Sequence, residues 1–156
     1  MNERAQHIIA ALELSPHPEG GYFKEVYRSA STVQSPIAGA ERNALTDIYF
    51  LLLAGQVSRF HRVLHDEIWH FYEGDPLMLV ELQPAAMIIR EVELATGGLP
   101  HYKHCIKGGD YQAAYSSGAY SLVGCTVAPG FAFDDFQFLA EDQRLQKALL
   151  EKYPQY

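Results

Sequence analysis

Residues 55–74 read GQVSRFHRVLHDEIWHFYEG, and they carry the clearest structural pattern in the chain. Residues 57–63 and 67–72 are rich in aromatic and β-branched side chains, and a short polar loop separates them. A glycine stands at each end of the stretch and bounds it with a turn residue. This pattern predicts two successive β-strands, with His61 in the first and Glu67 in the second.

Strand-like segments continue on both sides of this stretch, and turn residues separate them. They are residues 22–27, 47–53, 77–82, 87–94, 102–106, 111–115 and 120–127. Many short strands at a spacing of about ten residues are typical of a β-sandwich or barrel. Helical spacing of apolar residues predicts short helices over residues 3–14 and 140–152. Residues 29–44 are rich in Ser, Ala and Pro, and we expect them to form a loop. We expect the aromatic segment 131–138 to cover one end of the barrel.

Length and charge limit the classes of protein that this chain can belong to. Its 156 residues suit one domain spanning residues 1–156, without an internal boundary. The formal net charge of −7 argues against nucleic acid as a partner, because an acidic surface repels phosphate. Two cysteines make no disulfide framework, and the chain shows neither a secretory signal nor an apolar run that would span a membrane. We therefore expect a cytoplasmic protein that binds neither nucleic acid nor membrane.

The 55–74 stretch resembles the first sequence motif of the cupin superfamily. Gly55, His61, Glu67 and Gly74 fall at the spacing of that motif, but its second histidine is Val63 here. A second cupin motif can be laid on residues 107–116, where Gln112 takes the place of the last metal-binding histidine.

A closer resemblance is to the DUF985, or cupin 5, family of uncharacterised cupin-like proteins. It rests on the phrase HPEGGYF at residues 17–23 and on similar phrases within residues 60–72 and 121–131. The resemblance implies an all-β double-stranded β-helix (jelly-roll, cupin) barrel, often as a homodimer, and no settled activity. The two predicted helices would then be short additions at the N- and C-terminal ends.

The resemblance also bears on metal binding. In cupin geometry the inward positions would be His61, Val63, Glu67 and Gln112. Valine offers no lone pair, and a neutral amide oxygen is a poor ligand for a transition metal. Two ligands rarely hold a divalent ion against water, so we expect no cofactor. A divalent metal at His61 and Glu67 is the alternative.

Without a metal, His61 and Glu67 are still candidates for catalysis. An imidazole oriented by a carboxylate is what a general base needs, so His61 would abstract a proton and Glu67 would orient it. Six further residues are candidates for ligand binding: Arg59, Trp69, Phe71, Gln112, Tyr49 and Tyr111. Strand alternation puts Trp69 and Phe71 on the face of Glu67, and Arg59 on the face of His61.

Three functions stay open at this stage. The first is a metal-independent isomerase or epimerase acting on a sugar-like or carbonyl compound. The second is a non-catalytic ligand-binding or storage-type cupin, in which His61 and Glu67 only bond to each other. The third is a metal-dependent oxygenase with a degenerate metal site. A homodimer is also expected, because residues 47–53 are apolar on both strand faces, more than one core needs.

Overall fold

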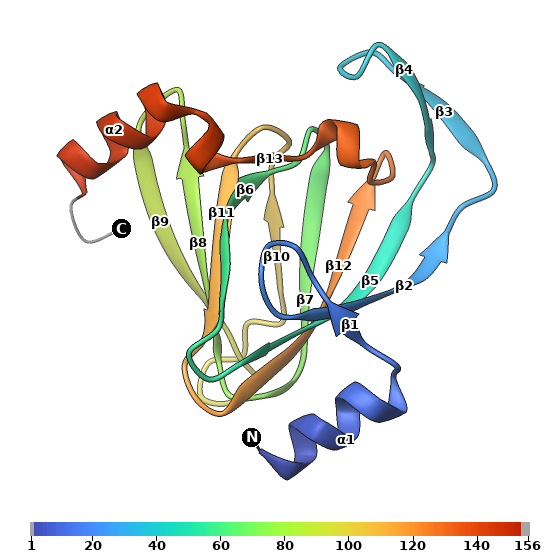
Figure 1. The fold of residues 1–156 in the computed structure, drawn as a ribbon, viewed down its shortest axis with the longest axis vertical. Coiled ribbons are helices and arrows are strands. Elements are labelled where there is room, and N and C mark those ends of the chain that lie inside the picture. The colour runs from blue at the N-terminus through green and yellow to red at the C-terminus, as the bar shows by residue number, and fades with distance from the viewer. Residues whose placement is uncertain (1, 154–156) are drawn as a thin grey trace.

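The structure is a computed structural model that describes residues 2–153, and two antiparallel sheets facing each other dominate it (Figure 1). The strands are β1 (Ser15–Pro16), β2 (Tyr22–Arg28), β3 (Thr32–Ser35), β4 (Ala40–Asn43), β5 (Thr46–Leu53), β6 (Val57–Arg62), β7 (Asp66–Gly74), β8 (Leu77–Gln83), β9 (Ile88–Leu94), β10 (Lys103–Ile106), β11 (Tyr111–Ser116), β12 (Tyr120–Ala128) and β13 (Gln137–Phe138). The helices are α1 (Glu3–Ala11) and α2 (Gln143–Lys152), with short 3-10 turns η1 (Phe133–Asp135) and η2 (Leu139–Glu141).

Strands that are distant in sequence are neighbours in both sheets. The six-stranded sheet runs β1-β2-β5-β12-β7-β10, and the five-stranded sheet runs β13-β6-β11-β8-β9. The central pairings join β5 to β12 and β6 to β11, so the chain crosses repeatedly from one sheet to the other. These antiparallel crossovers make the jelly-roll architecture, which confirms the predicted fold class.

The main core fills the space between the two sheets. Along β7 the side chains alternate, so that Trp69 and Phe71 are buried while Ile68 and Tyr72 are exposed. From the opposite sheet, Leu79 packs into the same cluster. This alternation is what a strand with one buried face requires, since successive side chains point to opposite faces.

Each helix covers part of an outer sheet face. Helix α1 packs Ala5 and Ile8 onto Leu51 and Leu122 of the six-stranded sheet. Helix α2 packs Leu149 onto a second outer cluster beside the five-stranded sheet. Within residues 2–153, no helix combines the length and apolar character that a membrane crossing needs.

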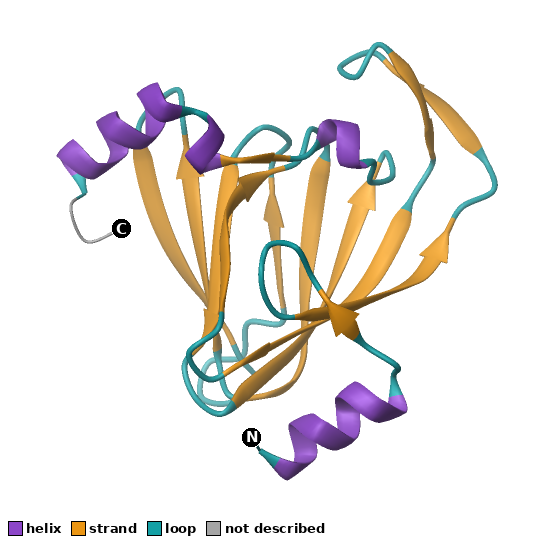
Figure 2. Cartoon of the chain, viewed as in Figure 1, coloured by secondary structure: helices purple, strands orange, loops and turns teal. Residues whose placement is uncertain are grey.

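One local prediction was wrong. Residues 29–44, predicted as a loop, contain the β3–β4 hairpin, which reaches beyond the main sheets (Figure 2). Its strands carry mostly polar side chains, and all but one of them are exposed or half-buried, so they lack the apolar alternation from which strands are predicted. Polar contacts at its tip and root, described below, hold it in place.

Candidate functional site

A cavity of about 200 Å³ lies between the two sheets. Its apolar lining residues are Phe23, Ile48, Val63, Val127, Phe131, Ala132, Phe133 and Phe136. Its polar lining residues are His17, Glu19, Glu25, Arg28, Thr46, His61, Glu67 and Cys125. Both residues that the sequence proposes for catalysis, His61 and Glu67, therefore reach one cavity.

His61 has hydrogen-bond acceptors at both ring nitrogens. Its Nδ1 donates to the backbone carbonyl oxygen of Arg59 at 2.7 Å, and its Nε2 lies 2.9 Å from Oε2 of Glu19. Burial acts to lower the pKa of His61, but Glu19, together with Glu67 and the Arg59 carbonyl, raises that pKa above its ordinary 6.5. Acceptors at both ring nitrogens favour the protonated form of His61. His61 thus pairs with Glu19 and not with Glu67 as predicted, and its role as general base stays a prediction.

Glu19, the partner of His61, comes from a tight turn that crosses β6. Burial acts to raise the pKa of Glu19, but the charge of His61 prevails and the pKa is lowered. The hydroxyl of Ser58 donates to the second carboxylate oxygen at 2.8 Å. Gly20 has φ +112°, and a Cβ there would lie 2.2 Å from the carbonyl oxygen of Val57, so a side chain at Gly20 would collide with β6. The turn thus approaches β6 closely enough to insert Glu19 beside His61.

His17 lies in the same turn and is neutral. The backbone N–H of Glu19 donates to Nδ1 of His17 at 3.2 Å, so the ring hydrogen is on Nε2. Burial lowers the pKa of His17, which also keeps the ring uncharged. Phe23 packs edge-on against it, with the ring centroids 4.5 Å apart. His17 can therefore offer one N–H donor to a molecule in the cavity.

Glu67 has only neutral hydrogen-bond partners. The side-chain amide of Gln112 donates to Oε2 of Glu67 in a short contact, and the thiol of Cys125 bonds it as well. Trp69 in turn donates from Nε1 to Oε1 of Gln112 at 2.7 Å, which orients the amide. Burial raises the pKa of Glu67, although the charge of His61 acts in the other direction. Glu67 thus differs from Glu19, whose pKa is lowered by the charged partner that Glu67 lacks.

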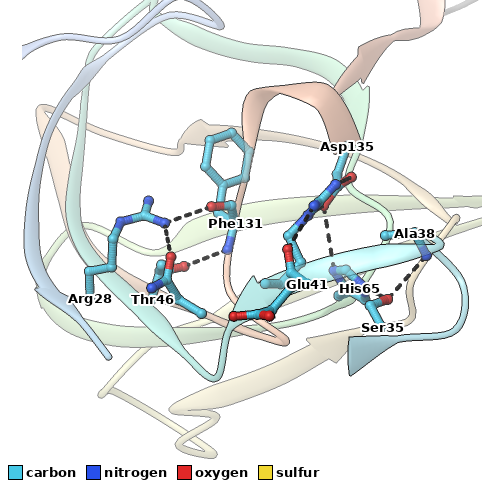
Figure 3. Close-up of polar contacts among 10 residues, drawn as sticks. Arg28, Ser35, Ala38, Glu41, Thr46, His65, Phe131 and Asp135 are labelled. Carbon is cyan, nitrogen blue, oxygen red and sulfur yellow. Dashed lines mark hydrogen bonds and ion pairs between the residues drawn. The ribbon is translucent and has the colours of Figure 1, made fainter. Parts of the chain in front are cut away.

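The aromatic wall of the cavity is formed by residues 129–136, here called the strap. Figure 3 shows how it is held: the Phe131 N–H donates to the Thr46 hydroxyl at 2.9 Å, and Arg28 donates to the Phe131 carbonyl at 3.1 Å. Arg42 of β4 donates twice to the carboxylate of Asp135, at 2.7 and 2.8 Å. Phe136 stacks on His61, with the ring centroids 5.1 Å apart. The β3–β4 hairpin and its root thus position one wall of the cavity.

The tip of this hairpin brings a serine, a histidine and an aspartate together. The Nε2 atom of His65 lies 2.7 Å from the Ser35 hydroxyl, and its Nδ1 lies 3.8 Å from Asp135 (Figure 3). The Ser35 oxygen also accepts the N–H of Ala38 at 3.1 Å, and Asp135 is already bonded to Arg42. Ser35 is buried, so this group anchors the hairpin and does not present a nucleophile.

Three of the predicted ligand-binding residues lie behind the cavity and do not line it. Trp69 and Phe71 are buried in the main core, and the Trp69 ring packs edge-on against Phe50 at 5.9 Å. Gln112 is fully buried between Trp69 and Glu67. Trp69 and Phe71 therefore do not line the cavity as predicted, and the aromatic rings that line it include those of the strap phenylalanines.

The other three predicted ligand-binding residues lie elsewhere. Arg59 points outward over the Phe138 ring, because a bulge in β6 sets Ser58 and His61 against Ala114 and Gln112 and breaks the alternation. Tyr49 packs near Tyr72 on the outer face of the six-stranded sheet. Tyr111 is buried under α2, with no hydrogen-bond partner for its hydroxyl among the described residues.

The residues at the site do not suit a cupin metal centre. Val63 offers no donor, the Gln112 amide is used by Trp69 and Glu67, and Nε2 of His61 is occupied by Glu19. Across residues 2–153, no group of three or more His, Cys, Asp and Glu side chains is placed to hold a metal ion.

Sequence reasoning missed several residues of the cavity: His17, Glu19, Cys125, Glu25 and Arg28. The phrase HPEGGYF contains His17 and Glu19, but on its own it indicates a family and not a site. A carboxylate in a turn between proline and glycine has no periodicity, so spacing cannot tell which strand the turn will cross. Glu25 and Arg28 are exposed on β2, as a strand edge predicts, and beside the bulge between Glu25 and Tyr27 they also line the cavity.

Comparison with known proteins agrees with this architecture. The family described as "Cupin superfamily (DUF985)" matches residues 6–139. A hypothetical protein from Leishmania major is 34% identical, with a TM-score of 0.85 over 97% of this chain and 93% of its own. A Shewanella oneidensis protein is 35% identical, with a TM-score of 0.77 over 97% and 90%. An uncharacterized protein of Saccharomyces cerevisiae is 28% identical over 161 residues, which cover 90% of this chain and 78% of the yeast protein.

The family match covers most of the chain, and the Leishmania and Shewanella proteins extend the likeness to nearly its whole length. This chain therefore belongs to the DUF985 family of the cupin superfamily.

Proposed function

We propose that this protein binds a small carbonyl compound in the cavity and moves a proton at the carbon next to the carbonyl, as isomerases and epimerases do. One observation supports this more than any other. Among the carboxyl groups that line the cavity, Glu19 and Glu25 are engaged by His61 and Arg28, whereas Glu67 is bonded by neutral groups. Glu67 is thus free to change its protonation state without breaking an ion pair.

The environment of Glu67 suits proton transfer. A general base works best when its pKa lies near the working pH, and burial moves the pKa of Glu67 in that direction. Gln112, oriented by Trp69, holds the carboxyl group in one position. In the proposed step, a C–H bond of the ligand breaks, its proton passes to Glu67, and the electron pair moves onto the carbonyl oxygen.

The negative charge that develops on that oxygen needs stabilisation. His17 offers its Nε2 hydrogen as a donor to that oxygen. Fixed donors and charges in a site that excludes water are effective at stabilising such an enolate. Return of the proton from Glu67 to a different position or face of the ligand would give an isomer or epimer.

Exchange of hydrogen for deuterium tests this proposal directly. Purified protein in D₂O is given aromatic, aliphatic and polyhydroxylated ketones, and NMR follows deuterium entering next to the carbonyl. We expect Glu67→Gln to slow the protein-dependent exchange by at least about 100-fold. An exchange rate that is unchanged by this substitution, or the absence of exchange with every ketone, would contradict the proposal.

A second candidate is a non-catalytic ligand-binding protein. Many polar groups of the cavity already hydrogen-bond one another, as Glu19 does with Ser58 and His61, and this favours a binding protein without catalysis. Saturable binding without deuterium exchange would support it. The metal-dependent alternative predicts stoichiometric transition metal in elemental analysis of purified protein, and we expect none because the donor set is incomplete.

A further inference from the structure

The two cations that line the cavity, Arg28 and His61, are each paired with a carboxylate that also lines it. Arg28 donates to both carboxylate oxygens of Glu25 at 2.8 Å, and His61 pairs with Glu19 at 2.9 Å. Arg28 uses its remaining contacts on Asn43 and on the carbonyl oxygen of Phe131. Within each pair the opposite charges offset each other, so an anionic ligand would meet no cation that is free to bind it.

The register of the six-stranded sheet shows how the polar groups are spread out. Arg28, Thr46, Val127 and Glu67 lie opposite one another on adjacent strands β2, β5, β12 and β7. Three strand spacings therefore separate Arg28 from Glu67, which is about 14 Å between the backbones. Between them lie Thr46, whose oxygen accepts the Phe131 N–H, and the apolar Val127, and Phe131 of the strap lies at the Arg28 and Thr46 end (Figure 3). The middle of the cavity thus offers apolar contact.

Few polar groups remain for a ligand with many hydroxyls. Each oxygen of Glu19 already has one partner, Ser58 or His61, and the Thr46 oxygen accepts the N–H of Phe131. The groups left for a ligand are few, among them the Thr46 O–H, the Glu67 carboxyl beside Gln112 and Cys125, and the Nε2 hydrogen of His17. A buried hydroxyl without a partner weakens binding, so a ligand that brings several hydroxyls into the cavity would bind poorly.

The volume of the cavity limits the size of the ligand. An apolar cavity of about 150 Å³ holds a benzene ring. The present cavity of about 200 Å³ therefore has room for one ring with a short substituent. Aromatic rings from the strap, such as Phe133 and Phe136, suit edge-on or stacked contact with such a ring.

We propose that the cavity binds an uncharged aromatic ketone or a similar flat, apolar carbonyl compound, and that it rejects sugars and carboxylates. The apolar ring would lie against the strap, and the carbonyl group would lie between His17 and Glu67. This inference rests on the proposed function for the position of the carbonyl group. The preference for a neutral, apolar ligand follows from the pairing of charges and from the cavity walls.

Three ketones test the inference by calorimetry on the purified protein. Phenylacetone is neutral and aromatic, phenylpyruvate replaces its methyl group with a carboxylate, and D-ribulose is neutral but polyhydroxylated. We expect phenylacetone to bind at least about tenfold more tightly than either of the others. Equal or weaker binding of phenylacetone, or no binding of any of the three, would overturn the inference.

A charge substitution examines the reason for the preference. Glu25→Gln removes the partner of Arg28, so the affinity ratio of phenylpyruvate to phenylacetone should rise by about threefold. Glu13→Gln is the matched control, because it removes the same charge from an exposed pair with Lys24 that does not line the cavity. If the affinity ratio rose equally in both variants, or rose in neither, paired charges would not set the preference.

The two proposals fail in different ways. Calorimetry measures binding without turnover, so selective binding of phenylacetone without deuterium exchange would refute proton transfer alone. Exchange that depends on Glu67 but occurs only with phenylpyruvate or D-ribulose would refute the ligand class and leave proton transfer standing.

Discussion

The buried pair of His61 and Glu19 links the N-terminal turn to β6, and its strength should depend on pH. The raised pKa of His61 makes its contribution full below pH 6.5, and that contribution is lost as pH rises through the raised value. The lowered pKa of Glu19 makes its contribution full above pH 4.5, and that contribution is lost as pH falls through the lowered value. The pair therefore stabilises the fold most between pH 4.5 and pH 6.5.

Glu19→Gln should reduce the free energy of unfolding by about 3 kcal/mol near pH 5.5, because it leaves a buried imidazolium without its partner. The loss should shrink as pH rises and His61 becomes neutral. Urea unfolding of both proteins at several pH values measures this. A loss that is the same at pH 5.5 and pH 9 would mean that no ion pair forms.

Substitution of Glu67 should stabilise the protein, whereas substitution of Glu19 should destabilise it. Burial raises its pKa, so its contribution to stability is full below pH 4.5 and is lost as pH rises through the raised value. Glu67→Gln removes that loss, and the variant should gain stability relative to the native protein as pH increases from 5 to 9. Glu93→Gln, at an exposed position of β9, is the control and should change little with pH. Parallel pH profiles for Glu67→Gln and the native protein would argue against a buried, titrating carboxyl group.

The sequence identified two of the important side chains and missed their partners. His61 and Glu67 stand at motif spacing on regular strands, so alternation and spacing suffice to place them together. Glu19 reaches His61 across about forty residues, through a turn whose path depends on close contact between Gly20 and Val57. No local pattern contains that contact, which is why His61 was given the wrong partner.

At the scale of elements, the β3–β4 hairpin holds the strap through Arg42 and Asp135. Arg42→Ala removes both hydrogen bonds that the guanidinium donates to the nearly buried Asp135 carboxylate, so the variant should be less stable than the native protein. Phenylacetone should also bind more weakly, because the phenyl rings of the strap lose their support. Chemical unfolding and calorimetry measure the two effects.

Lys24→Ala provides the comparison for this variant. It breaks an exposed pair with Glu13 and should change the stability very little, because water screens exposed ion pairs. If Arg42→Ala were no more destabilising than Lys24→Ala, or left phenylacetone binding unchanged, the hairpin would not position the strap.

Element boundaries were largely predictable, and departures from regular geometry were not. The strand expected over residues 57–63 is β6, which runs from Val57 to Arg62. The bulge inside it cannot be inferred from alternation, and it alone moves Arg59 from the cavity to the outer surface. The β3–β4 hairpin escaped prediction for a related reason, since polar contacts stabilise it and it has no apolar face.

At the scale of the whole molecule, the apolar second face of β5 has an explanation within the chain. Leu51 and Leu53 lie under α1, together with Ile8 and Leu122. The expectation of a homodimer was based on that second face, and α1 accounts for it. The sequence showed the surplus of apolar residues, but it could not show that the N-terminal helix folds back to cover them.

The homodimer remains a prediction, and its support now comes from another part of the same sheet. Beyond α1, the outer face keeps Tyr27, Ile68 and Tyr72 exposed by 55%, 39% and 44%. Pairing two copies through this face would remove these side chains from water. Light scattering after gel filtration should therefore give twice the 17.5 kDa mass of one chain, and Ile68→Lys should give the single mass, since it places a charge in the contact. A native protein that elutes with the mass of one chain at all concentrations would show that this face is left open to solvent.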